Sequence, residues 1–178
     1  MPKFIAYFGY GTNKDADMMA AMVGRKNLKG EPGMLPGYEV CIQKSNQIRN
    51  SVLKDAPFPV SPRELITKGF GGEFELYVIR ENPKGEAYGT IWYLTAEEME
   101  LVNKWELVDF GMYELTKATA ENNKGEKVPI VTQALLKEPK EIDRPVAGKD
   151  YEPYLVAKDY ILKKADDFRK NFWEKVST

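Results

Sequence analysis

The stretch Tyr7–Lys14, with the sequence YFGYGTNK, decides how the rest of the chain is arranged. An almost unbroken apolar run over residues 4–8 is typical of a strand that is covered on both faces. Gly9 and Gly11 then allow backbone angles that are closed to other residues, and they let a ligand approach the main chain closely. The pattern predicts a strand that ends in a glycine-containing loop and passes directly into a helix.

This helix is expected to be capped by Thr12 or Asn13 and to end at Gly24. Its apolar positions are Met18, Met19, Met22 and Val23. Such a junction directs free backbone N–H groups and the positive end of a helix dipole at one small volume, which suits a carboxylate or a developing oxyanion. The alternative is a tight turn that needs glycine only for its geometry. The loop lacks the ending of a phosphate-binding loop and the third glycine of a dinucleotide fingerprint, which disfavours nucleotide binding.

The 178 residues include one cysteine and no histidine. This length predicts a single domain over residues 1–178, with a core large enough to fold without a metal or a disulfide. Cys41 lies in an alternating segment and is expected to be a buried small hydrophobe. The absence of histidine excludes Ser-His-Asp and Cys-His chemistry and disfavours a zinc site. We therefore expect no metal and no cofactor.

Charge is evenly distributed, with 26 basic and 27 acidic residues and a formal net charge of −1. This balance gives no electrostatic footprint for nucleic acid or an anionic membrane. The first residues show no signal-peptide pattern, and no segment approaches the roughly 20 apolar residues of a membrane span. We expect a soluble, cytoplasmic protein with no nucleic-acid or membrane partner.

Strands are predicted wherever residues alternate in polarity or are rich in β-branched and aromatic side chains. The segments are residues 29–44 as two extended pieces, the second over 38–43, and then 73–81, 87–94, 112–120 and 128–136. The turn sequences NPKG at Asn82–Gly85 and NNKG at Asn122–Gly125 predict that the strands on either side form two hairpins.

Capping boxes at Ser61 and Thr95 predict the starts of two helices. A long amphipathic helix is predicted to begin at Pro153 and to pack across the sheet. Its apolar positions are Ala157, Ile161, Ala165, Phe168, Phe172 and Val176. Hairpins with single inserted helices indicate an α+β domain on a curved mixed or antiparallel sheet.

The segment Ser45–Phe70 interrupts this pattern with three prolines and no sustained periodicity. A loop of this length in a compact domain is often functional or mobile, so it is a candidate lid over a site. An insertion without a function is the alternative.

Glu106 is the candidate general acid/base, because without histidine this work falls to a carboxylate, a tyrosine or a lysine. Its neighbours Trp105 and Leu107 are apolar, and apolar surroundings raise the pKa of a carboxyl towards neutrality. In the alternative, Glu106 only caps or pairs at the end of a helix. Other acidic residues nearby are placed on a charged, solvated face: Glu97, Glu98 and Glu100.

Four motifs together resemble the gamma-glutamylcyclotransferase family, including its gamma-glutamylamine cyclotransferase-like members. They are Tyr10-Gly11-Thr12-Asn13, Gly71-Gly72, Tyr88-Gly89-Thr90-Ile91-Trp92, and Trp105-Glu106 followed by Gly111-Met112-Tyr113. They occur in the family's order, and the similarity runs over residues 4–136. The resemblance implies a small, closed or nearly closed β-barrel with flanking helices.

The resemblance also implies roles for individual residues. Glu106 matches the catalytic acid/base, Tyr113 matches a tyrosine beside the substrate, and the loop that holds the substrate through its backbone amides is matched by Tyr10, Gly11, Thr12 and Asn13. The sequence departs from the family pattern in four places: threonine replaces serine at position 12, lysine replaces leucine at position 14, a tyrosine is replaced near Ala134, and the 45–70 loop is longer than usual.

The implied reaction converts a gamma-glutamyl amine or peptide into 5-oxoproline and a free amine. The substrate's own α-amine attacks its γ-carbonyl, so the reaction requires no enzyme nucleophile, metal or cofactor. The expected partner is thus a small gamma-glutamyl molecule, and the protein is expected to be a monomer or a homodimer. The alternative is a non-catalytic member of the same fold that binds a small carboxylate or another protein.

Overall fold

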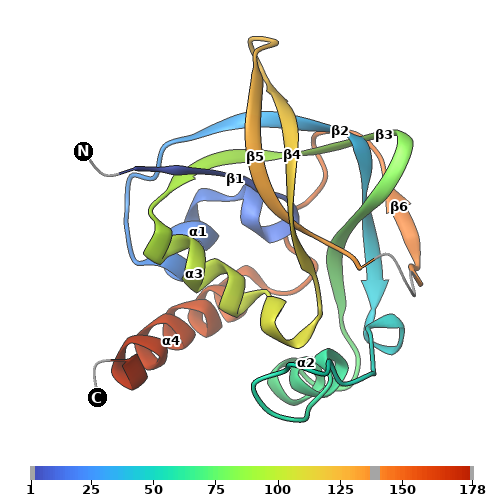
Figure 1. The fold of residues 1–178 in the computed structure, drawn as a ribbon, viewed down its shortest axis with the longest axis vertical. Coiled ribbons are helices and arrows are strands. Elements are labelled where there is room, and N and C mark those ends of the chain that lie inside the picture. The colour runs from blue at the N-terminus through green and yellow to red at the C-terminus, as the bar shows by residue number, and fades with distance from the viewer. Residues whose placement is uncertain (1–2, 137–140, 177–178) are drawn as a thin grey trace.

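A computed structural model describes the backbone of residues 3–136 and 141–176, and the side chains as far as residue 171. The described residues form six strands and four α-helices (Figure 1). The strands are β1 (Ile5–Gly9), β2 (Gly30–Lys44), β3 (Glu75–Leu94), β4 (Glu114–Asn122), β5 (Lys127–Ala134) and β6 (Arg144–Val146). The helices are α1 (Ala16–Val23), α2 (Pro62–Phe70), α3 (Ala96–Trp105) and α4 (Lys158–Val176).

The sheet has the order β3-β1-β5-β4-β2-β6, and an additional pairing of β2 with β3 closes five of the strands into a barrel. Neighbouring strands are antiparallel except β1 and β5, which run parallel through the pair Tyr7 and Val131. The prediction of an α+β fold on a mixed, barrel-like sheet is confirmed. The β4–β5 hairpin around Asn122–Gly125 is confirmed as well, with the Gly125 amide donating to the Asn122 carbonyl over 3.0 Å.

The predicted hairpin at Asn82–Gly85 is wrong, because β3 runs without reversal along one long partner, β2. The register passes from Pro36 opposite Glu86 to Tyr38 opposite Glu81, so Asn82–Gly85 bulges out where β2 has one residue. Both arms therefore pair with β2 instead of with each other. By the same pairing, the predicted two extended pieces within residues 29–44 are one strand, β2 (Gly30–Lys44).

The first helix starts later than predicted. Gly11–Lys14 forms a 3-10 turn, Asp15 is extended, and α1 begins at Ala16, so neither Thr12 nor Asn13 caps it. Gly24 ends α1 in the left-handed conformation with φ 77°, as predicted.

The two predicted capping residues begin their helices. Ser61 Oγ accepts from the Glu64 amide over 3.2 Å, and α2 extends to Phe70. Thr95 and Glu98 form both bonds of a capping box at α3, over 3.2 and 2.9 Å. Glu98 was predicted on a solvated face, but it is 8% exposed and pairs with Arg25 over 2.9 Å. A carboxylate that bends back to cap its own helix is carried towards the protein, where a cation compensates its burial.

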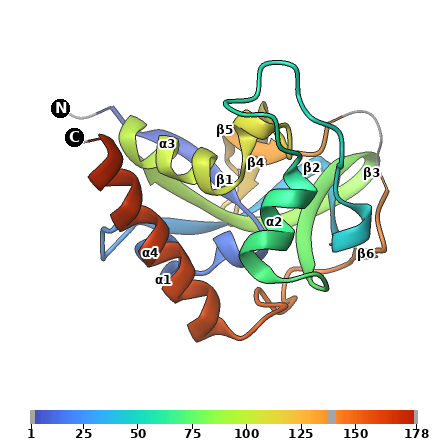
Figure 2. The same cartoon turned by 90° about the horizontal axis from the view of Figure 1, so that it is seen from below.

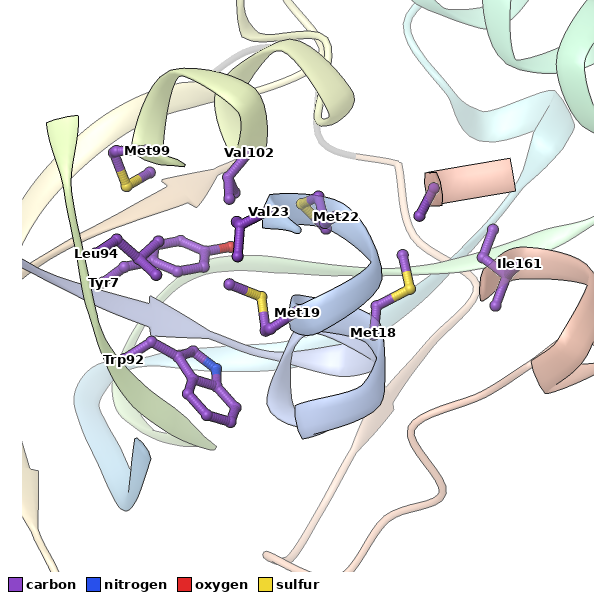
Figure 3. Close-up of a cluster of buried hydrophobic side chains, with 11 residues drawn as sticks. Tyr7, Met18, Met19, Met22, Val23, Trp92, Leu94, Met99, Val102 and Ile161 are labelled. Atoms are coloured by element: carbon purple, nitrogen blue, oxygen red, sulfur yellow. The ribbon is translucent and has the colours of Figure 1, made fainter. Parts of the chain in front are cut away.

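The C-terminal helix α4 begins at Lys158, five residues after Pro153, and packs against α1 and α3 instead of across the sheet (Figure 2). Its residues Ile161 and Ala165 join the buried side chains of α1 and α3 in one cluster. In Figure 3, Met18, Met19 and Met22 of α1 lie between the strand residues and Ile161. The side chains of Phe172 and Val176, predicted on the apolar face, lie outside the described residues.

A second apolar cluster fills the barrel, and a third lies at the end of the barrel next to α2. Cys41 belongs to the third cluster and is fully buried, as predicted. Burial raises the pKa of its thiol to about 12. The thiol is therefore protonated at neutral pH and serves as a small hydrophobe. Among the helices described, none combines the length and the apolar character that a bilayer crossing requires.

Candidate active site

A cavity of about 280 Å³ opens between the end of the barrel, α2 and the start of α4. One part of its wall is polar and includes Tyr7, Tyr10, Thr12, Asn13, Glu106, Tyr113 and Gln133. The rest is largely apolar and includes Leu65, Ile66, Phe70, Phe74, Leu76, Trp105, Leu107, Met112, Leu155, Val156, Ile161 and Phe168. Five of the six predicted site residues line this cavity. Within residues 3–136 and 141–176, no group of three potential metal ligands lies close enough to hold an ion.

Glu106 sits where α3 ends, with its amide donating to the Val102 carbonyl over 2.9 Å. The chain then turns sharply, because Leu107 has a left-handed φ of 57° and a 3-10 turn follows over Val108–Phe110. Burial raises the pKa of the Glu106 carboxyl from 4.5 to about 7, and a hydrogen bond from Asn13 opposes this rise. The sequence-based expectation of a pKa near neutrality agrees with this value. At neutral pH the carboxyl can accept a proton and can also donate one.

A chain of hydrogen bonds fixes the position of this carboxyl. Asn13 Nδ2 donates to Glu106 Oε1 and to the Tyr7 hydroxyl, both over 2.9 Å. The Tyr7 hydroxyl donates to Gln133 Oε1 over 2.7 Å, and Gln133 Nε2 donates to Asn103 Oδ1 over 2.9 Å. No bond from a described residue reaches Glu106 Oε2. This second oxygen is thus the one available to a molecule in the cavity.

The 10–13 loop contributes three of its residues to the cavity wall, and Gly11 is not among them. The Gly11 amide donates to the Tyr151 hydroxyl over 3.0 Å, and the Asn13 amide donates to the Tyr10 carbonyl over 3.1 Å. In the described residues, the Thr12 amide has no such partner. Among the amides of Gly11, Thr12 and Asn13, the one at Thr12 is therefore available to a ligand.

Gly11 has a geometric reason to be glycine. Its φ is +61°, and a Cβ at this position would lie 2.6 Å from the Cβ of Tyr77.

Lys14, where the family has leucine, does not line the cavity and instead holds the segment that follows β6. Its Nζ donates to the Tyr151 carbonyl over 2.5 Å and lies 3.8 Å from the centre of the Tyr151 ring.

Tyr113 is buried at the cavity wall, with 3% of its surface exposed. Its hydroxyl donates to the Tyr77 carbonyl over 3.2 Å and takes part in a side-chain hydrogen bond with Tyr10, which opposes the rise in pKa that burial causes. Because a hydroxyl oxygen has two lone pairs, one of them can still accept from a ligand. Burial raises the pKa of the Tyr7, Tyr10 and Tyr113 phenols well above their usual range. All three therefore remain protonated at neutral pH.

Sequence reasoning missed Tyr7, Gln133 and Asn103. Gln133 is 1% exposed, and a single glutamine inside the apolar strand IVTQALL is a signal that could have been noticed. Tyr7 has no such signal, since a tyrosine is an ordinary residue of a buried strand. Ala134, near which the resemblance implies that a tyrosine is replaced, packs in the barrel core and does not line the cavity.

The 45–70 segment reaches the cavity through α2. Leu65, Ile66 and Phe70 of this helix line the apolar wall. The Phe70 ring lies 5.4 Å from the Phe74 ring and 6.1 Å from the Trp105 ring, measured between centres. The long loop therefore supplies one wall of the cavity.

Comparison with solved structures shows that this architecture has been seen before. A gamma-glutamyl cyclotransferase aligns over 99% of this chain and 88% of its own, with 11% identity and a TM-score of 0.58. A Homo sapiens protein described as uncharacterized aligns over 99% of this chain and 88% of its own, with 13% identity and a TM-score of 0.55. An Arabidopsis thaliana protein whose structure was solved in solution aligns over 98% of this chain and 89% of its own, with 17% identity and a TM-score of 0.51.

Neither a protein-family model nor a curated protein matches the sequence. At identities of 11 to 17%, the structural likeness concerns the course of the backbone. The protein thus has a gamma-glutamylcyclotransferase-like fold.

Proposed function

We propose that the protein is a cofactor-independent cyclotransferase that converts a gamma-glutamyl amine or peptide into 5-oxoproline and a free amine. The observation that carries this proposal is Glu106, a carboxyl with a pKa of about 7 that is held at one oxygen by Asn13 at the wall of a cavity. The likeness to a solved gamma-glutamyl cyclotransferase supports it at the level of the fold.

The reaction follows from the chemistry of the substrate. Glu106 takes a proton from the α-ammonium, and the freed amine forms a bond to the γ-carbonyl carbon, closing a five-membered ring. The γ-carbonyl oxygen becomes an oxyanion. When it collapses, the bond to the attached amine breaks, and Glu106 returns the first proton to this leaving amine. The ring nitrogen loses its second proton to the Glu106 carboxylate, which leaves the lactam N–H of 5-oxoproline, and the released amine takes up that proton and departs as an ammonium. A base positioned beside both nitrogens can serve these transfers, because its pKa lies close to neutral pH.

The polar wall supplies groups for the rest of this work. The Thr12 amide would donate to the oxyanion, since preorganised donors stabilise charge that develops in the transition state. The Tyr113 hydroxyl would accept from the α-ammonium, because its own proton is already directed to the Tyr77 carbonyl. Holding the glutamyl chain curled between these groups brings amine and carbonyl together.

The alternative of a non-catalytic binding protein depended on the tyrosine that is replaced near Ala134. Ala134 itself packs in the barrel core and does not line the cavity, although Tyr10 and Tyr77 of the same cluster do. The carboxyl of Glu106 at the cavity wall is the observation that supports the enzyme over this alternative.

The test is to incubate the protein with a panel of gamma-glutamyl peptides and amines and to measure 5-oxoproline by chromatography. Wild type is expected to release 5-oxoproline and amine in equal amounts without added metal or cofactor. Binding of a gamma-glutamyl compound in calorimetry without any 5-oxoproline would instead support the binding protein.

A further inference from the structure

We propose that the leaving amine carries an uncharged, apolar substituent of aromatic or branched aliphatic type. This inference rests on the proposed function and names the class of substrate for the same cavity. It comes from the part of the wall that the reaction itself does not use.

Three elements make this wall apolar. α2 contributes Leu65, Ile66 and Phe70, the end of α3 contributes Trp105, and residues at and before the start of α4 contribute Leu155, Val156 and Ile161. Phe70 stands edge-on to Trp105 with an angle of 88° between the rings. Aromatic walls of this kind favour a flat apolar group by burial and by ring contacts.

The charges on the wall point to the same class. Apart from Glu106, the described lining residues include two charged side chains, Glu75 and Lys104. Glu75 forms an ion pair with Arg144 over 3.2 Å, and Lys104 pairs with Asp109. Both cavity charges therefore already have partners. A leaving group with a carboxylate or an ammonium would enter the cavity without a counter-ion, and an unpaired charge is costly to bury.

The substrate panel for this inference keeps the gamma-glutamyl half constant. Gamma-glutamyl-phenethylamide carries the apolar group, and gamma-glutamyl-phenylalanine adds one carboxylate to it. Gamma-glutamyl-ethylamide removes the ring, and gamma-glutamyl-cadaverine carries an ammonium. We expect kcat/KM for the phenethylamide to exceed that for each of the other three by at least about tenfold, in line with the discrimination that pocket contacts provide.

A charge added to the apolar wall should change this preference. In Leu65→Lys the new ammonium faces the leaving group, and the kcat/KM ratio of the phenethylamide to the phenylalanine compound should fall by about tenfold. Thr67→Lys is the matched control, because Thr67 lies on the same helix but not on the cavity wall. A ratio of two substrates is unaffected by partial unfolding of a variant, since the active fraction cancels.

The outcomes separate the two proposals. If 5-oxoproline forms but a charged or small substrate matches the phenethylamide, the apolar class is wrong and the cyclotransferase stands. The apolar class is also wrong, and the cyclotransferase stands, if neither Leu65→Lys nor Thr67→Lys changes the kcat/KM ratio of the phenethylamide to the phenylalanine compound. If none of the four compounds yields 5-oxoproline, both proposals are wrong.

Discussion

Asn13 Nδ2 donates a hydrogen bond to Glu106 Oε1 over 2.9 Å, and this contact joins residues 93 positions apart. The bond stabilises the charged form of the carboxyl, whereas burial disfavours it. The pKa of about 7 is the balance of these two effects. The Asn13–Glu106 pair is therefore the part of the site on which the predicted pH behaviour depends most directly.

Replacing Asn13 should shift the pH profile. In Asn13→Ala, burial acts on Glu106 without the opposing hydrogen bond, so the pKa of the carboxyl rises further above 7. Because the base works in its ionised form, the midpoint of the acidic limb of kcat/KM should move to higher pH. Asn123→Ala, in the exposed β4–β5 turn, is the control. An unchanged midpoint in Asn13→Ala would show that this bond does not tune the carboxyl.

Glu106→Gln should abolish most turnover while substrate binding persists. Glutamine keeps the shape of the side chain but cannot accept the ammonium proton at neutral pH, and general acid–base catalysis is typically worth about 10²–10⁴-fold. Glu100→Gln, on the exposed side of the same helix, should retain wild-type kcat. Turnover of Glu106→Gln within tenfold of wild type would rule out Glu106 as the base.

The same carboxyl should make stability depend on pH. Its pKa is raised from 4.5 to about 7 on folding, so its contribution to stability is fully present below pH 4.5 and is lost as pH rises through 7. Glu106→Gln removes this loss. In urea unfolding, the free energy of unfolding of the variant relative to that of wild type should increase between pH 4.5 and pH 8, by up to roughly 3 kcal/mol. A difference that stays constant over this range would contradict the assigned burial.

Tyr113→Phe should lower kcat/KM by about one to two orders of magnitude. This loss corresponds to one hydrogen bond to a charged group, which contributes roughly 1.5–3 kcal/mol. The free lone pair of its hydroxyl is the feature that would orient the substrate. Tyr88→Phe serves as the control, since the Tyr88 hydroxyl bonds Glu86 at the exposed surface. Equal kinetics in both variants would mean that Tyr113 only packs against its neighbours.

Gly11→Ala should destabilise the protein more than Gly125→Ala. Both glycines have a positive φ, but a Cβ at Gly11 would lie 2.6 Å from Tyr77, whereas nothing lies within 4 Å at Gly125. The conformational cost of the left-handed region is about 1–2 kcal/mol at each site, and overpacking adds about 1–3 kcal/mol at Gly11 alone. Urea unfolding of both variants measures the difference. Equal losses would exclude the close contact with Tyr77.

Features that depend on a few consecutive residues could be predicted from the sequence. The caps at Ser61 and Thr95 and the turn at Asn122–Gly125 are of this kind, because each is stabilised by bonds between residues at most four positions apart. The apolar neighbours of Glu106 likewise indicated a raised pKa. Short-range hydrogen bonds and local burial leave a pattern that a single segment carries.

Features that depend on a distant partner could not be predicted. Asn82–Gly85 has the composition of a hairpin turn, yet it bulges because both flanking arms pair with β2. Glu98 has charged neighbours, yet it is buried because Arg25 reaches it from 73 positions away. In each case a contact with a residue that is distant in sequence outweighs the local preference.

The amino-acid sequence by itself determined the α+β composition, the helix caps and the exclusion of histidine chemistry, and it singled out Glu106 as a candidate. Tertiary structure alone decided which groups surround that carboxyl. Tyr7 and Gln133 are 126 positions apart, and they meet because β1 and β5 pair in parallel within the barrel. A hydrogen-bond network across such a separation has no counterpart in local sequence, since its geometry exists only after the barrel has closed.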